Sequence, residues 1–323
     1  MKRMSRREAL TGLAAVTLAS SAFAGDDGYP KRSIQILVPT TPGGIFDLGA
    51  RRIGELLREA LGQPVIVDNK PGAAGAIATA QLLRSEKDGY TLGMASDSTV
   101  LINPLVVPGT NYAMEDFQLL SPLYMGAFAL AVGKSFPANS VQEFVQEAKR
   151  RGSLACGMFG NLSSSRMVAE LFMAATGVKL EPVPYRGESE AVRDVLGGVI
   201  PSFFGTTSNA LALHKAGDLR ILGLSSKDRL QALKEVPTFT ELGFESVEYT
   251  WFHGVMLPAG VPAPIVEKLS TTLFGLIGSD RFKSMLNEDL LPSPMLPAQF
   301  TEFAVRRREV VKRIIQERGL TPT

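Results

Sequence analysis

The stretch Pro42-Gly43-Gly44-Ile45-Phe46-Asp47 joins an apolar run, Ile34–Val38, directly to a segment with helical spacing. Gly43 and Gly44 permit a positive φ and let a ligand approach the main chain closely. The first N–H groups of a helix lack partners within the helix, and their partial positive charge favours a carboxylate or a phosphate. The stretch therefore predicts an anion site. The simpler alternative is a tight turn in which Asp47 is the N-cap of the helix.

Short apolar runs alternate with helical stripes around this loop. We expect strands at Ile34–Val38, 65–67 and 90–95, a helix over 47–61 that Gly62 ends, and a second helix after Gly75. Repeated strand, loop and helix segments are typical of an open parallel sheet.

A second series with the same pattern begins near residue 123. We expect strands at 128–132, 154–159, 182–185, 202–204 and 219–224. Ser140-x-x-Glu143 is a capping box, which starts a helix that ends near Arg151. The polar loop from Gly160 to Ser165 begins another helix, which Gly177 ends. Two similar lobes, each with a polar loop at a helix start, predict a ligand cleft between them.

The C-terminal part is expected to rejoin the first lobe. It has a strand pattern at 249–257 and helix patterns at 263–277, 281–287 and 298–319. The predicted organisation is thus an α/β protein with lobe 1 over 29–126 and 234–323 and lobe 2 over 127–233. Crossings between two such lobes work as a hinge.

The N-terminus has the features of a secretory signal. Basic residues including Arg6-Arg7 precede an apolar stretch over 10–18, and Ala22-Phe23-Ala24 follows, so we expect cleavage after Ala24. Residues 5–10 resemble a twin-arginine (Tat) signal, which we favour over the general secretory route, although Ala9 replaces the usual bulky apolar residue. No later stretch has the roughly 20 apolar residues that span a bilayer. The sequence predicts a soluble, exported protein.

The charge balance argues against a nucleic-acid or membrane-surface partner. The chain has 34 Lys and Arg, 32 Asp and Glu and a net charge of +2, and the leader carries four of the cations and one anion, so the mature chain is at −1. Such a chain has no general attraction for polyanions. The single cysteine, Cys156, excludes an internal disulfide and is expected to be a small buried hydrophobe.

No motif of a cofactor, metal or enzyme site is present. The segment Gly72–Gly75 lacks the G-x-G-x-x-G spacing, and the chain contains no P-loop and no G-x-S-x-G. His214 and His253 are the two histidines, neither has a metal-ligand spacing, and each is expected at a helix end or in the core. Trp251 is expected in the core. We predict a binding protein without cofactor or metal, and the enzyme alternative is a hydrolase that uses Ser163, Ser164 or Ser165.

Two arginines are candidates for pairing with a ligand. Arg166 opens the helix after the serine loop, and Arg186 follows Pro184-Tyr185. Either guanidinium could hold a carboxylate through two parallel hydrogen bonds. The alternative for each arginine is an ordinary position on a charged surface.

Motifs along nearly the whole mature chain resemble the substrate-binding receptors of tripartite tricarboxylate transporters, also called the Bug family. They include Tyr29-Pro30-x-x-Ser33-Ile34, Val38-Pro39-x-x-Pro42-Gly43-Gly44-x-x-Asp47, Gly62-Gln63-Pro64-Val65, Asn69-Lys70-Pro71-Gly72-Ala73-Ala74-Gly75, Asp88-Gly89-Tyr90-Thr91-Leu92, Val183-Pro184-Tyr185-Arg186-Gly187 and Pro258-Ala259-Gly260.

The resemblance implies a two-lobed periplasmic binding protein of type II, each lobe a mixed sheet flanked by helices, that closes on a small organic acid and hands it to a membrane permease. It implies that main-chain groups of the two loops, Thr40 to Asp47 and Gly160 to Ser165, hold the carboxylate. Ser96 to Thr99, Asn103, Tyr185 and Thr206 to Asn209 are weaker candidates, placed by polar chemistry at strand ends. The predicted binding residues are Thr40, Thr41, Gly43, Gly44, Ile45, Phe46, Asp47, Ser96, Ser98, Asn103, Gly160, Asn161, Ser163, Ser164, Ser165, Arg166, Tyr185, Thr206 and Ser208.

Departures from the family pattern bear on the ligand. Arg166 replaces a common histidine, and Pro201 replaces a common aspartate, which favours a more anionic ligand if both positions face the cleft. Ile45 and Phe46 could form an apolar wall, so we expect a carboxylate with a hydrophobic or aromatic portion. The protein is expected to be a monomer that serves permease subunits, and the alternative is a receptor that serves a sensor kinase.

Overall fold

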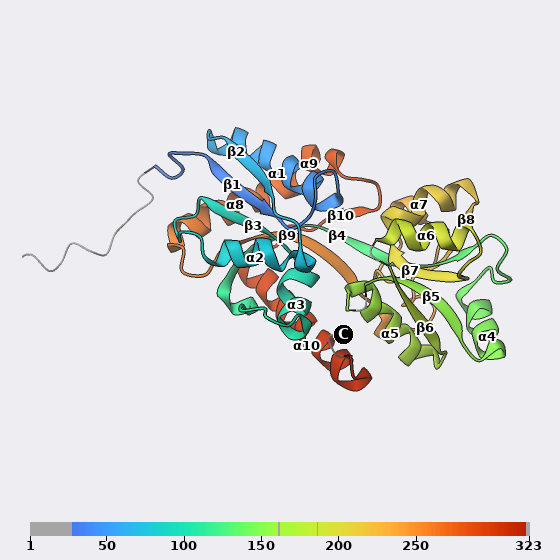
Figure 1. The fold of residues 1–323 in the computed structure, drawn as a ribbon. Helices are drawn as coiled ribbons and strands as arrows, with labels where there is room; N and C mark the ends of the chain where they lie inside the picture. Colours follow the sequence, from blue (N-terminus) through green and yellow to red (C-terminus); the bar gives the residue numbers. More distant parts are fainter. Residues whose placement is uncertain (1–27, 161, 186, 321–323) are drawn as a thin grey trace, which may run out of the picture.

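A computed structural model describes residues 28–160, 162–185 and 187–320. The predicted signal segment with its cleavage after Ala24, as well as Asn161 and Arg186, lies outside the described residues. The described chain forms two lobes joined by long strands (Figure 1). This confirms the predicted α/β, two-lobed class.

The first lobe is built on a mixed sheet. Its strands β1 (Ile34–Val38), β2 (Val65–Asn69) and β3 (Thr91–Ser96) are parallel, and β9 (Thr250–Pro258) and the first half of β4 (Phe117–Gly133) continue the sheet antiparallel, in the order β2-β1-β3-β9-β4. The short strand β10 (Leu290–Pro292) pairs with β4. The helices that follow these strands in the chain are α1 (Ile45–Leu61), α2 (Ala76–Leu83), α3 (Asn103–Val106), α8 (Ala263–Gly278), α9 (Asp280–Met285) and α10 (Pro297–Arg318).

The second lobe has its own mixed sheet. The second half of β4 pairs antiparallel with β7 (Ser202–Thr206) and with β8 (Leu219–Leu224), while β5 (Leu154–Phe159) is parallel to β7 and to β6 (Leu180–Tyr185). Its helices are α4 (Val141–Arg151), α5 (Ser164–Thr176), α6 (Glu188–Leu196) and α7 (Thr207–Ala216). The predicted strand and helix positions are confirmed within a few residues.

Strand β4 differs most from the prediction. The pattern indicated a strand over 128–132, whereas β4 runs for 17 residues and belongs to both sheets. Residues 117–133 are buried almost throughout, so they show no alternation between apolar and polar positions. Pro122 lies at an irregularity in the pairing with β9, where a missing N–H is tolerated. The expected parallel pairing of the strands over 34–95 is confirmed, and the antiparallel strands β4 and β9 make the sheets mixed, as the resemblance implied.

The loop before α1 also differs in detail. The helix begins at Ile45 rather than at Asp47, and its N-cap is Gly44 in an extended conformation, so the alternative with Asp47 as N-cap is wrong. Gly43 has φ 90°, a value that favours glycine. Gly62 ends α1 in the left-handed conformation, as predicted.

The capping box at α4 is half formed. Ser140 Oγ accepts the N–H of Glu143 at 3.1 Å, as predicted. The Glu143 carboxylate accepts the N–H of Asn139 at 2.7 Å, one residue earlier than the reciprocal bond of a capping box.

The chain keeps contacts with lobe 2 beyond residue 233, the predicted end of that lobe. Thr238 bridges to Leu224 at the end of β8, and the Phe239 ring lies 5.4 Å from that of Phe172 in α5. Tyr249 still donates its N–H to the carbonyl of Ser225 at 2.8 Å. We therefore propose that the second crossing lies near Thr250, later than the boundary at residue 233 that the pattern indicated.

Within the described ranges no helix is both long enough and apolar enough to cross a membrane.

Cys156 is fully buried in β5, as predicted, and this burial raises the pKa of its thiol to about 12.

Phe172 is the centre of the second lobe's aromatic core. Its side chain is fully buried, and the rings of Phe144, Phe204 and Phe239 lie within 6.1 Å of it. We expect Phe172→Ala to lower the free energy of unfolding by about 3–5 kcal/mol, because it leaves a cavity that the neighbouring rings cannot fill. Urea unfolding followed by circular dichroism measures this loss.

Phe274→Ala is the matched control. Phe274 is 40% exposed on α8, so its truncation should change the free energy of unfolding by less than about 1 kcal/mol. Equal losses in the two variants would contradict the assignment of Phe172 to the core.

Candidate ligand-binding site

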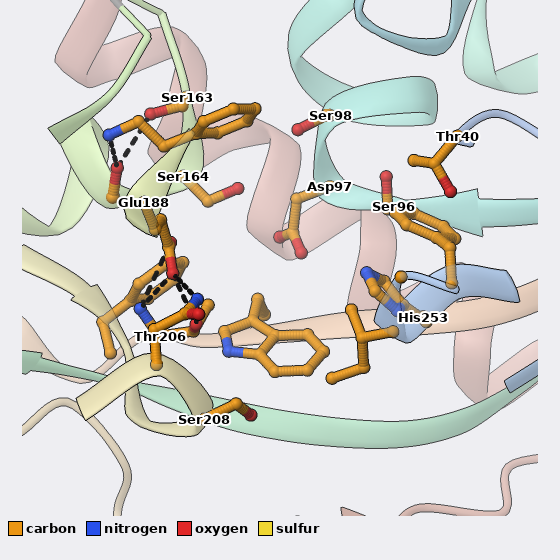
Figure 2. Close-up of a pocket in the computed structure, with 18 of the residues that line it drawn as sticks. Thr40, Ser96, Asp97, Ser98, Ser163, Ser164, Glu188, Thr206, Ser208 and His253 are labelled. Carbon is orange, nitrogen blue, oxygen red and sulfur yellow. Dashed lines mark hydrogen bonds between the residues drawn. The ribbon is translucent and has the colours of Figure 1, made fainter. Parts of the chain in front are cut away.

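A cavity of about 500 Å³ lies between the two lobes (Figure 2). Thr40, Ser96 and His253 lie on one side of the view, and Ser163, Glu188 and Thr206 lie on the other. The volume suits a small molecule. The described residues that line it are Thr40, Gly44, Ile45, Phe46, Leu48, Arg52, Ser96, Asp97, Ser98, Phe128, Phe159, Ser163, Ser164, Ser165, Glu188, Ser189, Thr206, Ser208, Asn209, Trp251, His253 and Asn287.

The N-terminus of α1 forms part of this wall. Gly44, Ile45 and Phe46 line the cavity, and no side chain of the described residues caps the first turn of the helix. The helix is 17 residues long, so its first N–H groups carry the full partial charge of a helix terminus. The buried Thr40 hydroxyl beside this turn has no hydrogen-bond partner within the described chain.

Asp47 stabilises the glycine loop that precedes α1. Its carboxylate accepts the N–H of Gly43 at 2.9 Å, Arg51 Nε at 2.9 Å and Asn69 Nδ2 at 3.0 Å. The hydrogen bond from Arg51 is the main cause that lowers the pKa of this carboxyl group. Asp47 therefore positions the glycine turn and remains ionised.

The serine loop of the second lobe caps its own helix. Ser163 is the N-cap of α5 and accepts the N–H of Arg166 at 3.4 Å, and its hydroxyl lies 2.9 Å from that of Ser165. Ser165 Oγ accepts the N–H of Phe159 at 3.2 Å. These hydroxyls line the cavity while they satisfy local main-chain groups.

Two acidic side chains also line the cavity. Asp97 accepts hydrogen bonds from the Tyr249 hydroxyl and the Phe252 N–H, both at 3.0 Å. Glu188 accepts from the N–H and the hydroxyl of Thr206, the N-cap of α7. Burial raises the pKa of both carboxyl groups. Arg52 is the only lysine or arginine among the described residues that line the cavity.

Trp251 and His253 cover the cavity from β9. They are two residues apart on one strand, so their side chains point to the same face. The Phe46 ring is stacked on the His253 ring with 3.5 Å between centroids. His253 is buried, as one alternative of the prediction had it, and burial lowers its pKa to about 3, so the ring is neutral. His214 lies in the last turn of α7, 3.2 Å from Glu235.

The structure brings most of the predicted binding residues together. Those that line the cavity are Thr40, Gly44, Ile45, Phe46, Ser96, Ser98, Ser163, Ser164, Ser165, Thr206 and Ser208, and those that do not are Thr41, Gly43, Asp47, Asn103, Gly160, Arg166 and Tyr185. Asn103 donates to the Ala74 carbonyl at 2.9 Å, and the Tyr185 hydroxyl donates to Asp194 at 2.7 Å. A contact between any of these residues and a ligand stays a prediction.

The argument for a more anionic ligand required Arg166 and Pro201 to face the cleft between the lobes. Arg166 forms an ion pair with Glu170 at 2.6 Å, and neither Arg166 nor Pro201 lines the cavity. These two positions therefore give no support for a more anionic ligand.

The sequence reasoning missed several lining residues. They are Leu48, Arg52, Phe128, Phe159, Glu188, Ser189, Trp251, His253 and Asn287. The spacing of two between Trp251 and His253 was a usable signal on a predicted strand. Glu188 and Phe128 had no such signal, because only the packing of the lobes brings them to the cavity.

No group of three or more histidine, cysteine, aspartate or glutamate side chains within the described ranges could hold a metal ion. The polar groups of the cavity are hydroxyls, main-chain N–H groups, one imidazole, two hydrogen-bonded carboxyl groups, the Arg52 guanidinium and the amides of Asn209 and Asn287. Such groups bind a polar organic molecule through hydrogen bonds.

Comparison with known proteins agrees with this geometry. The model of the tripartite tricarboxylate transporter family receptor matches residues 49–320. The protein BugT of Bordetella pertussis is 35% identical over 271 residues, which cover 83% of each chain. A solved structure described as a periplasmic transporter is 31% identical with a TM-score of 0.79, covering 91% of this chain and 99% of its own.

A further solved structure, R. palustris Rpa4515 with adipate, is 28% identical with a TM-score of 0.81, covering 91% of this chain and all of its own. These similarities confirm the resemblance that the sequence motifs indicated. The chain belongs to the family of tripartite tricarboxylate transporter receptors.

Proposed function

We propose that the protein is a periplasmic receptor that binds a small organic acid between its lobes and presents it to the permease of a tripartite tricarboxylate transporter. One observation carries the proposal: the uncapped N-terminus of α1 forms part of the cavity wall. Main-chain N–H groups at such a terminus bind a carboxylate without any cationic side chain.

Two helical segments at the cavity are already capped by side chains. Ser163 caps α5, and Ser96 and Thr99 cap the helical turn that starts at Asp97. The starts of α6 and α7 have no side-chain cap, but Glu188 is the first residue of α6 and accepts the N–H of Thr206, the N-cap of α7. A ligand carboxylate at these helices would have to displace a bonded side chain or lie beside the Glu188 carboxyl group. The relative that was solved with adipate also supports an acidic ligand.

The rest of the cavity suits an apolar body. Ile45, Phe46, Phe128, Phe159 and Trp251 provide an aliphatic and aromatic surface. In their ionised forms, the Asp97 and Glu188 carboxyl groups that line the cavity would repel additional negative charge on the ligand. We therefore favour an acid with one or two carboxylates and a hydrophobic portion over a small tricarboxylate.

Binding and closure are linked in this proposal. A ligand that contacts the first turn of α1 in lobe 1 and the serine loop in lobe 2 binds the closed form best, so it shifts the population toward that form. The permease would recognise the closed shape. We propose that the mature protein acts as a monomer after export and removal of its signal segment.

A hydrolytic role finds little support in the site. A serine nucleophile needs an adjacent base. The hydroxyls of Ser163 and Ser165 pair with each other, His214 pairs with Glu235, and His253 contacts Tyr124. A receptor should return every bound acid unchanged, which mass spectrometry of the acid after incubation with the protein measures.

Gly44→Val tests the acid site. Gly44 has an extended backbone, which a β-branched residue can adopt, and the nearest atom to an added Cβ is 3.9 Å away. Its side chain would cover the first turn of α1, and we expect affinity for the bound acid to fall by roughly tenfold to a hundredfold. Isothermal titration calorimetry measures the change.

Gly275→Val is the matched control. Gly275 lies on α8, away from the cavity, and an added Cβ meets no atom within 4 Å. This variant should bind like the unchanged protein. Unchanged affinity in a folded Gly44→Val protein would contradict the assignment of the acid site to α1.

A thermal-shift series tests the ligand class. Adipate and phenylacetate, each with an apolar body, should stabilise the protein more than citrate. At 100 times its dissociation constant a ligand adds about 2.7 kcal/mol of stability, which is enough to detect. Stabilisation by citrate alone would contradict the proposed preference and leave the carboxylate site standing.

A further inference from the structure

A chain of hydrogen bonds runs from the cavity to the first turn of α1. The Tyr124 hydroxyl donates to the Ile45 carbonyl at 2.7 Å, and the same hydroxyl lies 3.2 Å from Nδ1 of His253. Tyr124 on β4 and His253 on β9 are direct partners in the sheet register. The three groups therefore belong to rigid elements of one lobe.

The direction of each hydrogen bond in this series follows from the number of protons that each group has. A tyrosine hydroxyl has one proton, and a carbonyl oxygen only accepts, so the proton of Tyr124 lies on the bond to Ile45. The contact between Tyr124 and His253 then requires that His253 donates from Nδ1. A neutral imidazole that carries its proton on Nδ1 has a free lone pair on Nε2.

The sequence provides the space for this arrangement at Gly49. A Cβ at this position of α1 would lie 2.3 Å from the Tyr124 hydroxyl oxygen. Only glycine at position 49 lets the hydroxyl reach the helix backbone. Tyr124 itself is fully buried, so its hydroxyl cannot form a hydrogen bond with solvent instead.

The His253 side chain also forms part of the cavity wall. His253 lines the cavity, and within the described chain Nε2 has no hydrogen-bond partner. Phe46 covers one face of the ring, with an angle of 23° between the planes, and the Trp251 ring lies 4.9 Å away. Figure 2 shows His253 on the side of the cavity that holds Thr40 and Ser96.

We infer that His253 presents Nε2 as a fixed hydrogen-bond acceptor, and that the preferred ligand is an organic acid whose hydroxyl or amino group donates to it. This inference rests on the proposed function, because it names the class of acid that the same cavity selects. A buried acceptor left unpaired disfavours an acid that lacks the donor, which makes His253 a specificity-determining residue.

The surroundings of His253 agree with this reading. The cavity also contains the carboxylates of Asp97 and Glu188, which are further acceptors. Burial lowers the pKa of His253 to about 3, because the cation would lose its hydration, so Nε2 stays an acceptor at neutral pH. The lone pair repels a carboxylate, which therefore belongs at the N-terminus of α1.

Nitrogen NMR of the histidine rings tests the tautomer without any ligand. The chain has two histidines, so His214→Gln leaves the resonances of His253 alone in a protein labelled with ¹⁵N-histidine. We expect a protonated Nδ1 and an unprotonated Nε2 at pH 7. Tyr124→Phe, which removes only the hydroxyl, should convert this single form into a mixture. A protonated Nε2 in the unchanged protein would overturn the inference.

Binding of matched acids tests the selectivity. The series consists of phenylacetate with its 2-hydroxy, 2-amino and 4-hydroxy derivatives and hexanoate with its 2-hydroxy and 6-hydroxy derivatives. In at least one series a donor-bearing acid should bind about tenfold more tightly than its parent. In His253→Phe this ratio should fall to about one, while His214→Gln should preserve it.

The outcomes separate the two proposals. A ratio near one in the unchanged protein, or the same ratio in His253→Phe, would overturn the role of His253 while carboxylate binding stands. If no acid of either series binds, the selectivity of His253 is overturned, and the proposed function fails as well only if adipate and citrate also fail to bind. The NMR result distinguishes that case, because the tautomer does not depend on any ligand.

Discussion

The pairing of β4 with β9 is the interaction on which the rest of the structure depends. The first half of β4 pairs with β9 in one lobe, and its second half pairs with β7 and β8 in the other. One strand thereby contributes to both cores and crosses the hinge region. The same two strands supply Phe128, Trp251 and His253 to the cavity, so the element that joins the lobes also forms part of the binding surface.

Small residues make this pairing compatible with bulky rings. A Cβ at Gly126 would lie 2.2 Å from the Trp251 ring, and one at Gly49 would meet the Tyr124 hydroxyl. The missing side chains are therefore part of the site: one lets Trp251 lie across β4, and the other lets Tyr124 reach α1. Close packing fixes both rings before any ligand arrives, which lowers the cost of ordering the site on binding.

The electrostatics of the cavity follow from which helix starts are already satisfied. The Ser163 side chain caps α5, and the Glu188 carboxyl group lies at the starts of α6 and α7, which have no side-chain cap. At α1 no side chain of the described residues caps the first turn. The N-terminus of α1 is therefore the helix start that we propose for an external anion. Asp47 and Glu188 are both acidic residues near helix starts, yet Asp47 braces a loop behind the cavity and Glu188 faces into it.

Periodicity and turn residues were sufficient to predict most of the strands and helices and the two-lobed α/β class, because these depend on local spacing along the chain. The motif match likewise indicated the receptor family before any coordinates. The glycine turn at Gly43 and Gly44 was found in the same way. The two loop motifs, read separately, also identified residues of both loops that meet at the cavity.

Only the tertiary structure decided what depends on contacts between distant segments. Strand β4 is buried on both faces and so carries no periodic signal, and its antiparallel pairing with β9 joins residues more than a hundred positions apart. Arg166 pairs with Glu170 instead of facing the cavity, and His253 enters the cavity through its bond to Tyr124. Local sequence determines which elements form, but the direction of a buried polar side chain is set by the partner that satisfies it, and that partner comes from the fold.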